Sequence, residues 1–354
     1  MDADDQKIKQ KLVEAIQYVL QPPEKSNFLI INRSSDELSG LAELAAIELG
    51  LKAKKIDLNS KEPYKSFPEN LKKELCSGNY PRAAGFFTYP EGAVFDQTEK
   101  PARVELLGYI RDTPMGYAHA PAIDMDMALN GPLQCDYKEK IDISERLMEI
   151  LKNSRSMHVT SPSGTNLDIQ MKTSMEWQTD CNGVPPGPSS KGKIAQFPVG
   201  EVFIEKRRQV IKDDRSFSYP IKQNANGTVV CDLCTDGVTR MVDPSKPIRM
   251  RFEDGIVRYY YSADKDFNSL SSEWIKREHD YGLPTVLEEI GIGINEAARN
   301  TGKLLEVEKK YGTVHFALGN IRYHNDFVVG KPTVNVIRAN GRGKTIIQDG
   351  KLKL

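Results

Sequence analysis

The N-terminal part of the chain alternates between two apolar periodicities. Residues 6–20 carry apolar side chains at helical spacing and are followed by two prolines, a pattern that predicts an amphipathic helix. Residues 28–31 form a short, wholly apolar run, which is typical of a strand buried on both faces. A second helical pattern over residues 36–49 ends at Gly50, and residues 53–58 predict another strand. Because strands and helices alternate, we expect an α/β N-terminal domain with a doubly wound parallel sheet.

The next part, residues 61–135, is interrupted by many prolines and glycines and predicts one further strand over residues 103–110. No Gly-x-Gly-x-x-Gly sequence occurs in the N-terminal domain. Since those glycines bring the backbone close to the pyrophosphate of a dinucleotide, a dinucleotide-binding function has no support.

The pattern changes after a predicted helix over residues 142–153. Residues 157–160 and 166–169 flank a Ser-Pro-Ser-Gly turn and predict a β-hairpin. Further short segments with glycine turns follow, as in an antiparallel sheet. We therefore expect two domains, residues 1–145 and residues 146–354, of which the second is mostly antiparallel α+β.

Composition narrows the function. Of 354 residues, 39% are apolar and 28% are charged, which is typical of a globular protein in water. Lys and Arg together number 49, as do Asp and Glu, so nothing indicates binding to nucleic acid or to a membrane. The acidic N-terminus does not resemble a signal peptide, and we expect a cytoplasmic protein. Among the five cysteines, Cys231 and Cys234 form one Cys-x-x-Cys pair without a second, which indicates incidental thiols.

The candidate chemistry lies near the C-terminus, in residues 312–319 and 323–326. In a strand, the apolar side chains of the first segment share one face, which leaves His315 on the other. His324 and Asp326 are two residues apart, so a strand places their side chains side by side. Two imidazoles and a carboxylate suit a divalent transition metal. A short His-x-Asp pattern also occurs at purely structural positions, so the segment alone leaves both interpretations open.

Carboxylates upstream are the other candidate ligands. Glu201 follows a Pro/Gly turn at the start of a strand, where it either faces solvent or binds a ligand. Glu288 and Glu289 end a predicted helical segment that begins at Pro284, and the glycines after them let the backbone pass close to another group. Helix-surface charge before a glycine cap is the alternative. The same alternative applies to Glu306, Glu308 and Lys309.

Together these elements resemble the M29 metallo-aminopeptidases, the aminopeptidase T group, of which the chain looks like a divergent member. The resemblance covers roughly residues 140–330 in consistent order and implies a catalytic domain of the thermophilic-aminopeptidase type, whereas the N-terminal half matches only in architecture. It rests on residues 161–167, residues 198–203, residues 227–230, Asn295 with residues 307–315, and the His-x-Asp sequence.

The resemblance implies an aminopeptidase or amide hydrolase with a dinuclear metal centre, acting on a small peptide or amide. Two divalent ions, Zn²⁺, Co²⁺ or Mn²⁺, activate water in such a centre and polarise the carbonyl group. Glu289 and Tyr323 are the implied catalytic residues, and pairing into a homodimer is implied as well. Matched by position, the metal ligands are Glu201, Glu289, His315, His324 and Asp326, with Glu308 at or just behind the metals.

Two departures from the family pattern concern the substrate. Only eight residues separate His315 from His324, a shorter segment than in the family. Tyr323 is the nearest candidate for the family tyrosine, but as a neighbour of His324 it points to the opposite face of a strand. Asn166 stands where the family has an aspartate. Peptide specificity therefore does not follow from the resemblance.

The sequence is also compatible with two functions other than a hydrolase. A dihydroxypyridine ring-cleaving dioxygenase, a relative that looks built on the same scaffold with one iron, needs two histidines and one carboxylate for Fe(II), and His315, His324 and Asp326 match that set. Because a mononuclear iron site does not need Glu201 or Glu289, their presence favours the hydrolase. The third possibility is a non-enzymatic binding protein on a degenerate scaffold.

Overall fold

The computed structural model spans residues 1–354, and the chain forms two compact units. The first comprises Met1–Ile141 with Asp180–Val199, and the second comprises Asp142–Thr179 with Gly200–Leu354. The structure describes all residues except Ser34, 59–67, 88–99, 172–175, 188–189, 206, 213–214, 221–222, 236–239, 321–322 and part of 266–281. The side chains of residues 100–105, 207–212, 215–220, 240, 320 and 323–324 are also outside the described part.

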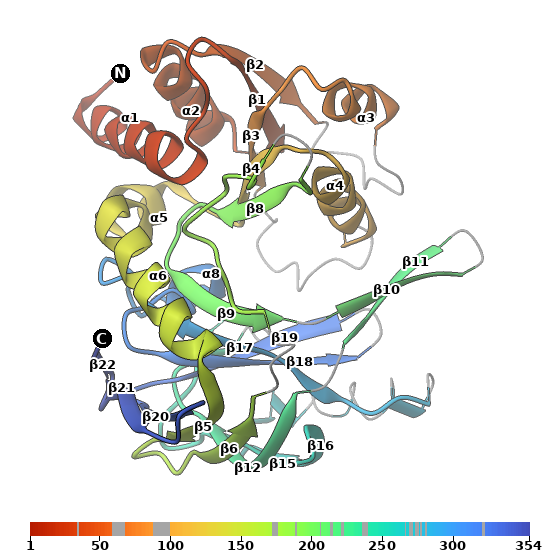
Figure 1. Ribbon diagram of the computed structural model, residues 1–354, viewed down its shortest axis with the longest axis vertical. Helices are drawn as coiled ribbons and strands as arrows, with labels where there is room; N and C mark the ends of the chain where they lie inside the picture. Colours follow the sequence, from red (N-terminus) through yellow and green to blue (C-terminus); the bar gives the residue numbers. More distant parts are fainter. Residues whose placement is uncertain are drawn as a thin grey trace. The chain divides into compact units, whose positions relative to one another are not determined.

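The first unit is built on a five-stranded parallel sheet with the strand order β2-β1-β3-β4-β8 (Figure 1). The apolar run predicted as a doubly buried strand is β1, in which six of seven residues are buried. The strands are β1 (Asn27–Arg33), β2 (Lys52–Asp57), β3 (Arg82–Phe87), β4 (Gly116–Pro121) and β8 (Lys193–Gln196).

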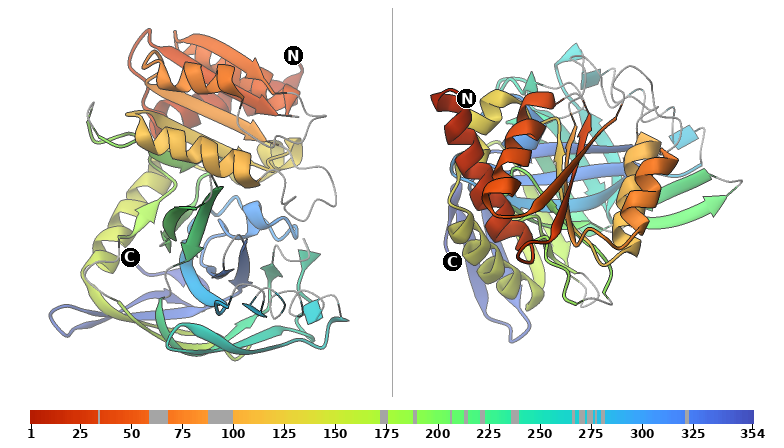
Figure 2. Two further views of the ribbon diagram at one scale, coloured as in Figure 1. Left: turned by 90° about the vertical axis from the view of Figure 1, so that its right-hand side faces the viewer. Right: turned by 90° about the horizontal axis from the view of Figure 1, so that it is seen from above.

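Helices cover both faces of this sheet, with α1 and α2 on one side and α3 and α4 on the other (Figure 2, right). Leu71 of α3 and Ile110 of α4 pack with Leu29 and Ile31 of β1 in one buried cluster. The predicted doubly wound α/β fold is therefore confirmed. The helices are α1 (Ala3–Ala15), the π-helical turn η1 (Ile16–Leu20), α2 (Asp36–Glu48), α3 (Glu69–Cys76), α4 (Lys100–Asp112), α5 (Met125–Asn130), the 3-10 turn η2 (Pro132–Gln134) and α6 (Tyr137–Lys152).

Two features of the first unit differ from what the sequence predicted: one helix in place of a strand, and an edge strand that comes from beyond residue 145. Residues 103–110, predicted as a strand, belong to helix α4. The prediction was wrong because Leu106 and Ile110 are four residues apart and both buried, so the apolar run also fits a helical stripe. β8 pairs in parallel with β4, so residues that follow α6 in the sequence complete the first sheet.

The second unit is a large sheet of fifteen strands among the described residues. Neighbouring strands are antiparallel, and the predicted hairpin at residues 157–169 is confirmed as β5 and β6. The predicted α/β-plus-antiparallel fold class is thus observed. In sheet order the strands are β14 (Arg240–Met241), β13 (Cys234–Thr235), β19 (Tyr323–Val329), β18 (Val314–Asn320), β17 (Val286–Gly293), β16 (Ile256–Tyr261), β15 (Ile248–Glu253), β12 (Asn224–Cys231), β6 (Asn166–Gln170), β5 (Ser154–Thr160), β20 (Thr333–Arg338), β21 (Gly343–Gln348) and β22 (Lys351–Leu352).

Two further strands, β9 and β7, join this sheet beside β17. β9 (Glu201–Glu205) pairs with β17 on one side and with β7 (Gln178–Thr179) on the other. A separate hairpin is formed by β10 (Arg207–Lys212) and β11 (Arg215–Pro220), and α8 (Leu304–Val307) is a single short helix. No helix among the described residues is long and apolar enough to cross a membrane.

Candidate metal centre

Backbone pairing brings four of the predicted ligands to one face of the second sheet. Gly291 of β17 pairs with His315 of β18, and Gly293 of β17 pairs with Glu201 of β9. Glu289 and Asp326 both pair with Ala317, from β17 and β19 respectively. Directly paired residues of antiparallel strands project on the same face, and so do residues two apart. Glu201, Glu289, His315 and Asp326 therefore share one face across four strands.

The strand β17 replaces the helix that the sequence predicted before Glu289. All eight of its residues are buried, because β17 is paired with β18 on one side and with β9 and β16 on the other. The pairing with β18 shifts between Leu287 and Glu289, which leaves Glu288 as the extra residue of a bulge. The helix prediction was wrong, and neither glutamate is helix-surface charge.

The glycines after Glu289 do let another group approach, as predicted, and at Gly291 that group is the ring of His315. A Cβ atom added to Gly291 would lie 2.0 Å from Cε1 and 2.1 Å from Nε2 of that imidazole. Real Cβ atoms do not approach other atoms this closely, so the ring occupies the space that any other residue would fill. The absence of a side chain at Gly291 is a requirement of the site.

Glu201, Glu289 and His315 form the compact part of the centre. Nε2 of His315 donates a hydrogen bond to Oε1 of Glu289 over 3.3 Å and lies 3.6 Å from Oε2 of Glu201. One potential ligand atom from each of the three residues lies within 4.8 Å of the other two, and all three residues are buried. Two carboxylates and one imidazole at these distances are a donor set for a divalent metal ion.

Lys309 brings a positive charge to the same cluster. Its Nζ atom lies 2.8 Å from Oε1 of Glu201 and 2.9 Å from Oε1 of Glu308, and its side chain is fully buried. The prediction of helix-surface charge was wrong for Lys309, because helix α8 ends at Val307 and the chain then turns inward. Glu308 therefore contacts the same ammonium group as Glu201.

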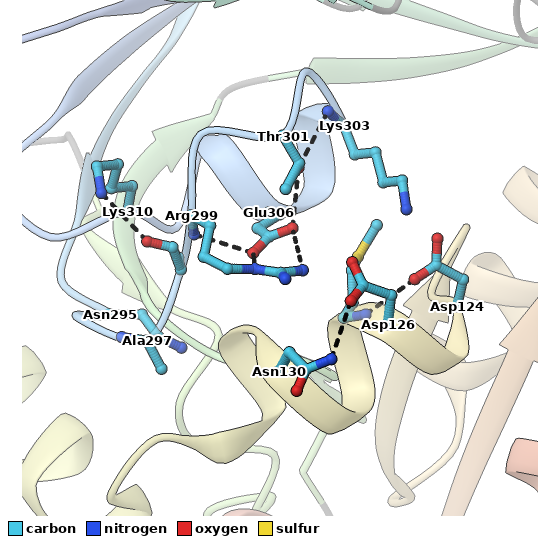
Figure 3. A network of polar contacts seen from close by, with 12 residues as sticks. Asp124, Asp126, Asn130, Asn295, Ala297, Arg299, Thr301, Lys303, Glu306 and Lys310 are labelled. Atoms are coloured by element: carbon cyan, nitrogen blue, oxygen red, sulfur yellow. Dashed lines mark hydrogen bonds and ion pairs between the residues drawn. The ribbon is translucent and has the colours of Figure 1, made fainter.

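A second ion pair, between the half-buried Arg299 and the buried Glu306, crosses the loop of residues 295–309 (Figure 3). Glu306 is fully buried, so its interpretation as surface charge was also wrong. Its carboxylate accepts hydrogen bonds from N and Nε of Arg299 at 2.9 and 2.8 Å, and from the hydroxyl of Thr301 at 2.9 Å. The N–H of Asn295 donates to the carbonyl of Lys309 over 2.8 Å. This backbone hydrogen bond joins the two ends of the loop, and the contacts of Glu306 connect residues within it.

The charges around His315 act on its pKa in opposite directions. Burial has the largest single effect and lowers the pKa. The hydrogen bond with Glu289 and the negative charges of Glu201, Asp326 and Glu289 together outweigh burial and raise the pKa of His315 to about 9. Asp326 is itself buried, so its charge reaches the imidazole with little screening. Without a metal ion the imidazole is therefore protonated at neutral pH.

Two predicted residues cannot be placed in the centre. The side chains of His324 and Tyr323 lie outside the described residues. Their backbone positions are given, and His324 pairs with Gly319 two positions along β19 from Asp326. His324 as a ligand and Tyr323 as a catalytic residue stay predictions.

The described residues fit a divalent cation in their charge as well as in their donor atoms. Four carboxylates, those of Glu201, Glu289, Glu308 and Asp326, face one ammonium and one imidazolium, which leaves the cluster with an excess of negative charge. Buried charge is costly unless it is compensated. A divalent ion supplies the missing positive charge and takes the place of the imidazole proton.

The Cys231 and Cys234 thiols take no part in this cluster. Both are reduced and buried, and Sγ of Cys231 donates to the carbonyl of Cys234 over 3.2 Å. Burial raises the pKa of Cys231 to about 12, so the thiol is protonated at neutral pH. A protonated thiol is neither a nucleophile nor a metal ligand.

The chain resembles proteins of known structure in its fold. No protein-family model and no curated protein matches the sequence, but solved structures do, and they give the chain an M29-like fold. Wild-type AmpT from Thermus thermophilus is 13% identical with a TM-score of 0.67, and the match covers 99% of this chain and 100% of AmpT. The 2,5-dihydroxypyridine dioxygenase from Pseudomonas putida KT2440 is 14% identical with a TM-score of 0.66, covering 99% and 97%. At these identities the similarity establishes the fold alone.

Proposed function

We propose that this protein is a divalent-metal-dependent hydrolase that cleaves an amide or peptide bond in a small substrate. The observation that carries the proposal is the buried cluster of Glu201, Glu289 and His315, with one potential ligand atom of each within 4.8 Å of the others. Asp326 and, by prediction, His324 complete the set. A bound divalent ion supplies Lewis acidity, which polarises a carbonyl group and makes hydroxide available near neutral pH.

The residues of the chain have separate roles in this proposal. The ring of His315 lies over the Cα atom of Gly291, where no side chain is in the way. Its hydrogen bond with Glu289 turns Nε2 toward the carboxylates. Glu289 retains 8% of its surface exposed, more than Glu201 or His315, and is the carboxylate best placed to accept a proton from water. Glu201 connects the centre to Lys309.

The experiment combines metal content with activity. The protein is purified without chelator, its metal content is measured by elemental analysis, and hydrolysis of amino-acid anilides and small amides is followed before and after chelator treatment. We expect stoichiometric metal, activity that chelator removes, and recovery with Zn²⁺, Co²⁺ or Mn²⁺. Protein that binds no metal under any of these conditions contradicts the proposal and favours a non-enzymatic binding protein.

A mononuclear Fe(II) oxygenase is the second candidate, and a specific observation favours it. The dioxygenase from Pseudomonas putida matches this chain with a TM-score of 0.66, against 0.67 for AmpT. In this alternative His315, Asp326 and His324 hold the iron, and Glu201 is not needed. Oxygen consumption with Fe(II) and a dihydroxypyridine, retained in a Glu201→Ala variant, distinguishes it from the hydrolase.

A further inference from the structure

We propose that the centre holds one divalent cation, and that the ammonium group of Lys309 takes the place of a second. The inference rests on the proposed metal-dependent function and goes beyond it by fixing the number of ions. The resemblance to dinuclear peptidases implies two ions, so the position of Lys309 changes the expectation from two to one.

Glu201 has two carboxylate oxygens, and they face different partners. Oε2 faces His315 at 3.6 Å, and Oε1 faces the Lys309 ammonium at 2.8 Å. A carboxylate that bridges two cations also gives one oxygen to each. Here one of the two cations is a covalently attached part of the chain.

Glu308 is the second carboxylate in contact with the Lys309 ammonium. Its Oε1 atom lies 2.9 Å from Nζ of Lys309, so the ammonium lies between two carboxylate oxygens. A second metal ion that used Oε1 of both glutamates would coincide with the ammonium. Two positive charges in such a small volume repel each other, and burial leaves little water to screen them.

Lys309 has no simple way to leave this position. Its side chain is fully buried, and a Cβ atom at Gly200 would lie 3.3 Å from Cβ of Lys309, so its base is packed against the neighbouring backbone. Its carbonyl accepts from the N–H of Asn295, which anchors the main chain at the same residue. The ammonium is therefore a fixed charge of the centre.

The test is the metal stoichiometry of the full chain, with Lys309→Met as the variant that keeps the unbranched stem of the side chain, removes its charge and leaves the position of Nζ open. Apo-protein is loaded with Mn²⁺, and bound metal is measured by elemental analysis after dialysis. Electron paramagnetic resonance distinguishes isolated Mn²⁺ from a coupled pair. We expect one ion and an uncoupled spectrum for the natural protein, and two ions with a coupled spectrum for Lys309→Met.

A buried lysine elsewhere provides the matched control. Lys140 is 1% exposed and pairs with Glu139, so Lys140→Met removes a similarly buried charge from the unit that does not contain the centre. Its stoichiometry is expected to stay at one. Lys309→Arg keeps the charge and is also expected to bind one ion.

The outcomes separate the two proposals. Two ions in the natural protein overturn this inference and leave the metal-dependent function intact. No bound ion overturns the proposed function and the inference with it. One ion in a folded Lys309→Met variant also overturns the inference, because the lysine is then not what limits the number. If Lys309→Met does not fold, the natural protein decides: a second Mn²⁺ equivalent that binds and gives a coupled spectrum overturns the inference, and one that stays free supports it.

Discussion

The imidazole of His315 and the carboxylate of Glu289 meet across neighbouring strands, with 3.3 Å between Nε2 and Oε1. The two residues are not direct partners in the sheet, because His315 pairs with Gly291 and Glu289 pairs with Ala317. The contact is therefore diagonal, and it crosses the position of Gly291. Long side chains reach such diagonal neighbours when nothing lies between them.

Gly291→Ala is expected to disrupt the centre by pushing the His315 ring aside. The added Cβ would lie 2.0 Å from Cε1 of the ring, and overpacking of this kind costs about 1–3 kcal/mol of unfolding free energy. If the same cost opposes metal binding, metal affinity should fall by about 5- to 150-fold, since 1.4 kcal/mol corresponds to a factor of ten. Denaturant unfolding and a metal titration measure the two effects.

Gly40→Ala is the control for that variant. Gly40 lies in α2, and an added Cβ meets nothing within 4 Å. An alanine there should stabilise the helix by about 0.5–1 kcal/mol and leave metal binding unchanged. Equal effects of the two substitutions contradict the role assigned to Gly291.

Glu289→Gln keeps the shape of the side chain and removes the charge that accepts a proton. Turnover should fall by about 10²-fold or more, the usual contribution of a positioned general base, while the circular dichroism spectrum stays that of the natural protein. The assay is hydrolysis of the best anilide substrate at saturating metal. A folded, metal-loaded Glu289→Gln variant with full activity removes Glu289 from the mechanism.

Metal binding and protonation compete for His315, and this predicts opposite pH trends. In metal-free protein the pKa of His315 is raised from 6.5 to about 9, so its protonated form stabilises the fold below pH 6.5. That contribution is lost as the pH rises from 6.5 through 9. A metal ion needs the neutral imidazole, so metal affinity should rise over the same range.

Thermal unfolding with chelator and with saturating Zn²⁺, at several values of pH between 6 and 9.5, tests the competition. The increase in Tm caused by zinc should grow with pH, and a zinc effect independent of pH argues against His315 as a ligand. His315→Gln should remove the trend from the metal-free protein.

Glu306→Ala is expected to loosen the loop that carries Lys309. Arg299 and Thr301 lose their shared acceptor, and leaving buried donors without one costs about 1–3 kcal/mol, toward the lower end because Arg299 is 34% exposed. The exposed Glu145 of α6 offers a control in the same unit, with a change within about 0.5 kcal/mol on substitution by alanine. Chemical denaturation compares the two variants, and equal stabilities contradict a supporting role for Glu306.

Periodicity predicted the parts of the fold that depend on repeated apolar positions. A continuous apolar run predicted the buried strand β1, a turn sequence between two short segments predicted the β5–β6 hairpin, and alternation predicted the face of His315. It failed at residues 103–110, where one apolar run fits both a strand and a helix. It failed again at Glu288 and Glu289, whose charges suggested a surface in a strand that is buried on both faces.

The site was predictable only as a set of residue types. The family motifs pointed to Glu201, Glu289, His315 and Asp326, and the register of four strands explains how distant segments supply them. Lys309 was missed because charge in a short helical segment is normally solvated. Its place in the motif at residues 307–315, next to a predicted ligand, was the available signal.

The path of the chain through the two units restricts how the protein can be divided. It passes from one unit to the other after Ile141, after Thr179 and after Val199. A fragment that ends near residue 145 lacks the edge strand β8 and leaves the hydrogen-bonding groups along β4 open to water or to another chain. The second unit likewise needs two separate pieces of sequence. A division of the chain anywhere between residues 145 and 180 therefore separates segments that belong to the same unit.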